Sequence, residues 1–302
     1  MREIAQILCP VDFSDASAHA VEQAIALAGW RQARITALHV STPIVASVPG
    51  LPPLGERASS VELERLRARA AQFFAPAEAA GVGVDIVIDV GQPAAAILAR
   101  AEALPADVIV IGTHGTSGFL HLLLGSVTEK VLRRAPCAVL TVPPRARVTS
   151  ALPFARILCP VDFSDPSLAA FQEASSLAAA SGAALTVLHV VEWPWQEPPA
   201  PAARDLPPEQ AVALAEFRRY VETSARMRLD KLAAGSVLIP PPATSIVHGR
   251  SHVEILRVAA LHRADLIVMG VHGRNVIDLT LFGSTTNQVV RLATCPVLTL
   301  RR

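Results

Sequence analysis

The sequence predicts an α/β fold in which one domain, an open sandwich with a five-stranded parallel sheet, occurs twice in tandem. Residues 7–15 read ILCPVDFSD, and residues 157–165 repeat these letters without a change. The chain has 302 residues, about twice the usual length of one domain. In each copy, short β-rich runs alternate with longer segments of helical period, a pattern typical of a parallel sheet covered by helices.

The elements follow in order from this pattern. The run ILCPV predicts the first strand, and the segment after it has apolar residues at i, i+3, i+4 and i+7, the spacing of a helix face that packs on a sheet. This stripe consists of Val21, Ala24, Ile25 and Ala28. The run TALHV predicts the second strand, and three later runs complete the sheet. The strands of the first copy are expected near residues 7–11, 36–40, 84–88, 108–111 and 138–142.

The second copy is longer than the first. After the second strand, where TALHV matches TVLHV, it gains eight residues before the glycine-rich loop. We assign the extra residues to the Pro-rich segment 193–208, which corresponds to a shorter Pro-rich segment at 43–53, and expect surface loops at both. The linker between the copies is roughly residues 143–153. The expected domains are residues 1–145 and 153–302.

Composition narrows the choice of partner and compartment. Lysine and arginine number 27 against 26 acidic residues, without a strongly basic stretch, so we expect no nucleic-acid partner. The longest apolar stretch, residues 176–191, is interrupted by polar residues and is too short for a bilayer, so we expect no membrane association. The first residues lack the pattern of a secretory leader, which favours a cytoplasmic protein. The cysteines have no close pairs, so we expect buried thiols in a reducing compartment at Cys9, Cys137, Cys159 and Cys295.

A glycine framework follows the fourth strand of each copy. It reads G, two residues, G, nine residues, G-S, and the residues between the glycines differ between the copies. Glycine lets a ligand approach the main chain, and Gly-Ser at the start of a helix leaves N–H groups facing an anion. The framework therefore indicates an anion-binding loop. Its members are Gly112, Gly115, Gly125 and Ser126 in the first copy, and Gly270, Gly273, Gly283 and Ser284 in the second.

A helix cap is the alternative explanation for the Gly-Ser pair. Ser126 precedes Glu129 by three residues, the spacing of a capping box that needs no ligand. The second copy has Asn287 in place of the glutamate but retains Gly-Ser. This difference weakens an explanation by capping alone.

Asp12 and Asp162 stand where the first strand of each copy ends. Turn formation, with Ser14 or Asp15 capping the next helix, would account for Asp12 without a ligand. In open parallel sheets, however, ligands bind beyond the carboxyl ends of the strands where the strand order reverses, so Asp12 and the Gly112 loop could face one site.

Four histidines also recur in matching positions. Their spacing does not suggest a set of converging metal ligands, so we expect no metal site. They are His39, His114, His189 and His272.

Taken together, these residues resemble the universal stress protein family, whose ATP-binding members carry the same glycine pattern after the fourth strand. The strand-one aspartate, the LHV strand end, the GxHG loop, the GS helix start and the closing strand occur in family order in both copies. The resemblance implies the strand order 3-2-1-4-5. It also implies that the family's usual dimer, which pairs through the fifth strands, could form within this one chain, with a homodimer of whole chains also open.

The resemblance further implies an ATP site in each copy, with or without Mg²⁺. In the first copy, Asp12 would lie near the adenosine, the main chain of Val40 would contact adenine, and Gly112 and Gly115 would line the ribose and phosphates. The phosphate tail would be held by Gly125, Ser126 and Val127. The corresponding residues of the second copy are Asp162, Val190, Gly270, Gly273, Gly283, Ser284 and Thr285.

Two departures from the family pattern distinguish the copies. The basic residue that often follows GxHG is Thr116 in the first copy and Arg274 in the second. Gly118 of the first copy is replaced by Val276 in the second. The two sites therefore need not bind equally.

The leading functional hypothesis is an ATP-binding stress-response or signalling module that changes its contacts with an unknown protein partner. No lysine follows a glycine, so a P-loop lysine is absent from the sequence, and no nucleophile and base are evident. A binding module is therefore expected rather than an enzyme. A slow ATPase, which would need bound Mg²⁺ and a positioned water, and a scaffold with vestigial pockets are the alternatives.

Overall fold

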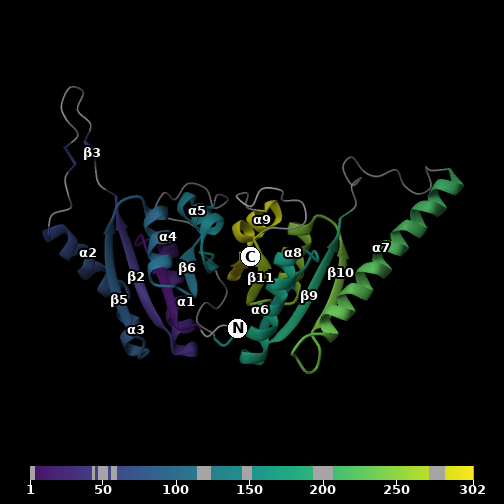
Figure 1. Cartoon of the computed structure of the whole chain (residues 1–302), viewed down its shortest axis with the longest axis horizontal. Helices are drawn as coiled ribbons and strands as arrows, with labels where there is room; N and C mark the ends of the chain where they lie inside the picture. The colour runs from purple at the N-terminus through teal and green to yellow at the C-terminus, as the bar shows by residue number, and fades with distance from the viewer. Residues whose placement is uncertain are drawn as a thin grey trace.

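The computed structural model of the chain describes residues 4–42, 45–46, 54–55, 60–113, 124–144, 152–192, 207–271 and 283–301. In this part of the chain ten strands form one continuous sheet, with the two halves side by side (Figure 1). The strands of the first half are β1 (Gln6–Pro10), β2 (Arg34–Ser41), β5 (Val84–Val90), β6 (Val108–Gly112) and β7 (Ala138–Val142). Those of the second half are β8 (Arg156–Pro160), β9 (Ala184–Val191), β10 (Ala243–His248), β11 (Leu266–Gly270) and β12 (Val297–Leu300).

The strand order confirms the fold expected from the sequence. The first half runs β5-β2-β1-β6-β7 in space, which is the order 3-2-1-4-5, and the second half runs β10-β9-β8-β11-β12. Within each half, the pairings between neighbouring strands are parallel. The first half also contains a short antiparallel ribbon, β3 (Val45–Ala46) with β4 (Leu54–Gly55), where the sequence predicted only a loop.

Helices cover both faces of the sheet and divide the core into two layers. One layer lies under α1 (Asp15–Arg31), α3 (Ala75–Ala79), α6 (Asp165–Ser181) and α7 (Pro208–Ala234), and the other under α4 (Pro93–Ala103), α5 (Ser126–Arg134), α8 (Ser251–Leu261) and α9 (Ser284–Leu292). A further helix, α2 (Ser60–Phe73), precedes α3. Alternate residues of β1 enter opposite layers, as a strand buried on both faces requires: Ile7 and Cys9 enter one, Leu8 the other. The stripe predicted on α1 is buried throughout.

The two halves join through their fifth strands. β7 and β12 pair antiparallel, with Thr141 opposite Val297 and Thr299 opposite Val139. The Thr141 hydroxyl donates to the Val297 carbonyl at 3.1 Å, and the Thr299 hydroxyl donates to the Val139 carbonyl at 3.2 Å. Both threonines are buried. The pairing that the resemblance implied for two chains is therefore present within this one.

Most of the extra length of the second copy lies in a helix and the rest in the connection that follows it, which corrects the prediction that placed it in the Pro-rich segment. α7 has 27 residues, where α2 and α3 have 14 and 5. The buried residues of α7, Ala225, Leu229 and Ala233, fall in its second half, and its first half extends away from the sheet (Figure 1). Residues 193–206 lie outside the described residues.

The described helices contain none that is long and apolar enough to span a membrane. The cysteines are free thiols, and Cys9, Cys159 and Cys295 are buried as expected. Cys137 is only half-buried, so the prediction was wrong for that residue. Burial raises the pKa of the Cys137 thiol to about 11 and that of Cys295 to about 12, because the thiolate loses its hydration.

Candidate functional site

The strand order reverses beside β1 and β8. In the first half, β1 pairs with β2 on one side and with β6 on the other, and the helices that follow β1 and β6 lie in opposite core layers. Open α/β sheets bind ligands at such a switch point, beyond the carboxyl ends of the strands. Asp12 lies two residues past the end of β1 and Gly112 ends β6, so the structure brings these two site residues to the same edge. Asp162 and Gly270 take the same places in the second half.

The Asp12 carboxylate organises the turn after β1. Its Oδ1 atom accepts hydrogen bonds from the Ser14 N–H at 3.1 Å, from the Ser14 hydroxyl at 2.5 Å and from the Ser17 hydroxyl. Ser14 is the N-cap of α1 and accepts from the Ser17 N–H at 3.2 Å. The alternative of turn formation is thus confirmed for Asp12: at least one carboxylate oxygen holds the turn, whatever else this side chain contacts.

The first glycine of the framework is required by a helix. A Cβ atom at Gly112 would lie 2.8 Å from the carbonyl oxygen of Ala16, and one at Gly270 would lie 2.9 Å from the main chain of Pro166. These distances are shorter than van der Waals contact, so each glycine lets its strand approach the first turn of α1 or α6. The second glycines, Gly115 and Gly273, lie outside the described residues, as do His114 and His272.

The Gly-Ser pair opens a helix without a side-chain cap. Gly125 is the N-cap of α5, with φ −59°, and Ser126 is the first helical residue. The alternative of a capping box is therefore wrong, because Ser126 stands one position after the N-cap. Glu129 instead accepts from Arg133 Nη2 at 2.7 Å. In the second half, Gly283 is likewise the N-cap of α9, and no side chain caps that helix.

A threonine that the sequence reasoning missed ties each of these helices to the fourth strand. The Thr128 hydroxyl donates to the Gly112 carbonyl at 2.8 Å, and the Thr286 hydroxyl donates to the Gly270 carbonyl at 2.9 Å. The Gly125 N–H also bonds to the Thr113 carbonyl at 2.9 Å. The recurrence of both threonines 16 residues after the first glycine was visible in the repeat. These bonds fix the uncapped N-terminus of α5 beside the end of β6.

The main chain of Val40 faces the switch point. Residues of a parallel strand direct their N–H and C=O groups to the two neighbouring strands in alternation. The Ser41 carbonyl accepts from the Gly91 N–H just past β5, so the N–H and C=O of Val40 are directed to the opposite side, past the end of β1. In the second half, the Val191 carbonyl accepts from the Gly249 N–H, which directs the main chain of Val190 past the end of β8.

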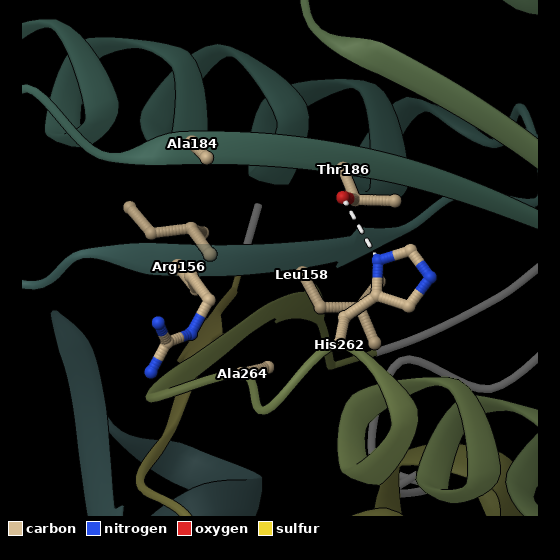
Figure 2. Close-up of a pocket in the computed structure, with 7 residues that line it drawn as sticks. Arg156, Leu158, Ala184, Thr186, His262 and Ala264 are labelled. Atoms are coloured by element: carbon tan, nitrogen blue, oxygen red, sulfur yellow. Dashed lines mark hydrogen bonds between the residues drawn. The ribbon is translucent and has the colours of Figure 1, made fainter.

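A separate small pocket lies at the opposite edge of the sheet, at the amino ends of β8 and β9 (Figure 2). Its lining includes Arg156, Leu158, Thr186 and His262, with the Thr186 hydroxyl 3.5 Å from His262 Nδ1. The pocket holds about 100 Å³, well below the roughly 300 Å³ at which small-molecule sites usually begin. Within the described residues there is no group of three His, Cys, Asp or Glu side chains that could hold a metal ion.

Comparison with known proteins agrees with this fold. The family model described as the universal stress protein family matches residues 3–143 and 153–301. A universal stress protein of Mycolicibacterium smegmatis is 27% identical over 98% of this chain and 96% of its own length. The crystal structure of a universal stress protein from Archaeoglobus fulgidus covers 100% of both chains with a TM-score of 0.69 at 23% identity. A universal stress protein solved in complex with cAMP covers 47% of this chain and 98% of its own, with a TM-score of 0.35 at 26% identity. With both copies matched, the chain belongs to the universal stress protein family.

Proposed function

We propose that each half of the chain binds an adenine nucleotide, ATP in the first place, at the carboxyl edge of its sheet. The observation that carries this proposal is the start of α5 and α9. Each helix begins at a Gly-Ser pair with no side-chain cap, beside the end of the fourth strand. The first N–H groups of a helix need acceptors, and together with the helix dipole they favour an anion such as a phosphate.

The phosphates would lie against the N–H groups at the helix starts. In the first half these belong to Ser126 and Val127, and in the second half to Ser284 and Thr285. The N–H groups of Gly125 and Gly283 donate to the Thr113 and Val271 carbonyls, so these two glycines would instead let the phosphates approach the helix start closely. Gly115 and Gly273 would let the loop after the fourth strand approach the phosphates closely. Gly112 and Gly270 contribute indirectly, because they bring that strand end against the preceding helix.

The base would lie past the ends of β1 and β8. The N–H and C=O of Val40 are directed to that space side by side, and so are those of Val190. Adenine offers an acceptor, N1, next to a donor, the N6 amino group, which is the complementary pair. Asp12 and Asp162 would face the adenosine while one of their carboxylate oxygens holds the turn. ATP would bind with or without Mg²⁺.

The same geometry suggests how binding could serve a stress response in the cytoplasm. A nucleotide at the proposed site would contact the turn before α1 and the start of α5, two segments at one edge of the sheet. A nucleotide bound there would change the surface that this edge of the sheet offers to a protein partner. In this proposal the chain acts as a nucleotide-dependent binding module rather than as an enzyme.

The proposal is tested first by identifying the ligand. Mass spectrometry of small molecules released from freshly purified protein should detect an adenine nucleotide, and calorimetry with ATP, ADP and cAMP should give up to two sites per chain. Protein that retains no adenine nucleotide and binds none of the three would overturn the proposal.

A matched pair of variants tests the helix start itself. Gly125→Asp places a carboxylate at the N-cap and Gly125→Asn a neutral side chain of the same shape; both residues are good N-caps, so the helix should be retained. The aspartate should weaken ATP binding at the first site by about tenfold or more, because it competes with and repels the phosphate. The asparagine should weaken it less. Equal affinity of the two variants would contradict the assignment of the phosphate to this helix.

A further inference from the structure

His39 and His189 occupy equivalent places at the ends of β2 and β9. His39 Nδ1 lies 2.9 Å from the Val11 carbonyl oxygen, and His189 Nδ1 lies 2.7 Å from the Val161 carbonyl oxygen. A carbonyl oxygen only accepts hydrogen bonds, so Nδ1 carries a proton and donates in each case. These two histidines were considered above as metal ligands, but their geometry assigns them to the strand end.

Each histidine donates to the carbonyl that would accept the next hydrogen bond between the first two strands of its half. Among the described residues, the ladder from β1 to β2 ends with the Val11 N–H bonded to the Leu38 carbonyl at 2.8 Å. The parallel pattern would next join the Val40 N–H to the Val11 carbonyl. That carbonyl accepts from the His39 ring, and the register pairing of the two strands stops at Pro10 and Leu38.

The second half shows the same arrangement. The Val161 N–H bonds to the Leu188 carbonyl at 2.8 Å, and the Val161 carbonyl accepts from His189. The ladder would next have reached the N–H of Val190, the counterpart of Val40. The register pairing of β8 with β9 stops at Pro160 and Leu188.

A stack of side chains holds each histidine ring in place. Phe13 lies 4.5 Å from the His39 ring, centroid to centroid, and the Arg69 guanidinium lies 4.3 Å from the Phe13 ring centroid. Phe13 adopts φ 62°, a left-handed conformation that is unfavourable for a bulky residue. Such a conformation persists only where its surroundings enforce it, and often marks a functional site.

The stack recurs in the second half although the helix that supplies the arginine has changed. Phe163, with φ 63°, lies 4.7 Å from the His189 ring, and the Arg228 guanidinium lies 4.0 Å from the Phe163 ring centroid. Arg69 belongs to α2 and Arg228 to the longer α7. Two copies that differ in this region have therefore kept one arrangement around the strand end.

We propose that His39 and His189 are positioning residues that end the ladder one bond early, so that the N–H of Val40 and of Val190 stays available to the base of a bound nucleotide. The inference rests on the proposed adenine site. It adds a reason why the N–H of Val40 or Val190, on a strand inside the sheet, is not used by the neighbouring strand and can bind a ligand. The Phe and Arg side chains support the histidine by fixing its ring.

Residue-resolved hydrogen exchange on the ligand-free full chain tests the ladder without any nucleotide. In His39→Leu the Val11 carbonyl loses its donor, so the Val40 N–H should take it and exchange at least about tenfold more slowly than in the unaltered protein. In His39→Asn the amide Nδ2 can replace Nδ1, and exchange at Val40 should remain fast. Val190 serves as the control within the same chain. Unchanged exchange at Val40 in a folded His39→Leu protein would overturn the proposal.

Binding measurements test the link to the base. They are made in a Gly283→Asp background, which leaves the first site as the one under study. His39→Leu should weaken ATP binding by about tenfold, the loss of one hydrogen bond to the base, and leave the affinity for inorganic tripolyphosphate unchanged. Equal weakening of both ligands would indicate general damage and overturn the proposal. If the unaltered protein binds neither ligand, the proposed function fails, while the exchange result still decides whether His39 ends the ladder.

Discussion

The turns after β1 and β8 share one sequence as far as Asp15 and Asp165, yet their hydrogen bonds differ. The Ser17 hydroxyl donates to Asp12 Oδ1, whereas the Ser167 hydroxyl donates to the Ser164 carbonyl at 2.9 Å. A hydroxyl has one proton, so Ser167 cannot hold Asp162 in the way that Ser17 holds Asp12.

The first sequence difference after the shared motif is Pro166 in place of Ala16. Ser14 caps α1 with its side chain, whereas Ser164 makes no such bond to α6. In both turns, however, the aspartate Oδ1 accepts from the N–H and the hydroxyl of the serine two residues on. An identical motif thus fixes the shape of the turn, while the residues just beyond it decide how firmly the carboxylate is held. The two candidate sites therefore share the shape of this turn and differ in the hydrogen bonds that hold its aspartate.

The largest expected effect on stability concerns a feature that both halves share, the glycine at the end of the fourth strand. Gly112→Ala and Gly270→Ala each place a methyl group within 2.9 Å of helix main chain, which can move only if the helix moves. Each should lower the free energy of unfolding by about 2–3 kcal/mol, as overpacked cores do, measured by equilibrium denaturation in urea.

Gly29→Ala is the control for these two variants, because the nearest atom to its Cβ lies 3.9 Å away. Gly29 lies inside α1, so alanine there should be neutral or stabilising by up to about 1 kcal/mol. If Gly112→Ala proved as harmless as Gly29→Ala, the close approach of β6 to α1 would not be the reason for that glycine.

The next largest effect should differ between the halves, because it concerns the aspartate of each turn. Asp12→Ala removes the acceptor of two serine side chains and one N–H, and should cost about 1–2 kcal/mol of stability. Asp162→Ala should cost less, because Ser167 keeps its bond to the Ser164 carbonyl. Thermal unfolding of both variants measures the difference.

The contribution of Ser17 can be isolated in the same experiment. In a Ser17→Ala background the cost of Asp12→Ala should fall toward that of Asp162→Ala, because the bond that distinguishes the two turns is then absent. Equal costs of the two aspartate variants in the unaltered background would show that the extra hydroxyl bond is not stabilising.

The strands and the sheet order were predictable from the sequence because each central strand is a short apolar run buried on both faces. β1 and β6 lie within one residue of the segments predicted for them, and β7 matches its segment at both ends. The duplicated motif extended the same prediction of strands and sheet order to the second half. The length of α7 was not predictable in this way, since a count of extra residues does not say whether they extend a loop or a helix.

The candidate site was predicted less completely, for two physical reasons. Close approach of a ligand and close approach of a helix both require the absence of a Cβ atom. The glycine pattern therefore could not show that Gly112 is needed for the contact between β6 and α1. The letters S-x-x-E fit a capping box, but the N-cap is Gly125 and the helix begins at Ser126. The third helical position is therefore Thr128, whose hydroxyl reaches β6. Where a helix begins depends on such long-range bonds.

The smallest expected effect on stability concerns the seam between the halves, which is the antiparallel pairing of β7 with β12. Thr141→Val and Thr299→Val replace a buried hydroxyl by a methyl group of similar size, so each removes one hydrogen bond across the β7–β12 pairing. Each should cost about 1 kcal/mol of unfolding free energy, and the two costs should be similar, because the bonds are equivalent in the repeat. A much larger cost for one threonine than for the other, measured by denaturation in urea, would show that the two halves contribute unequally to the seam, as they do to their turns.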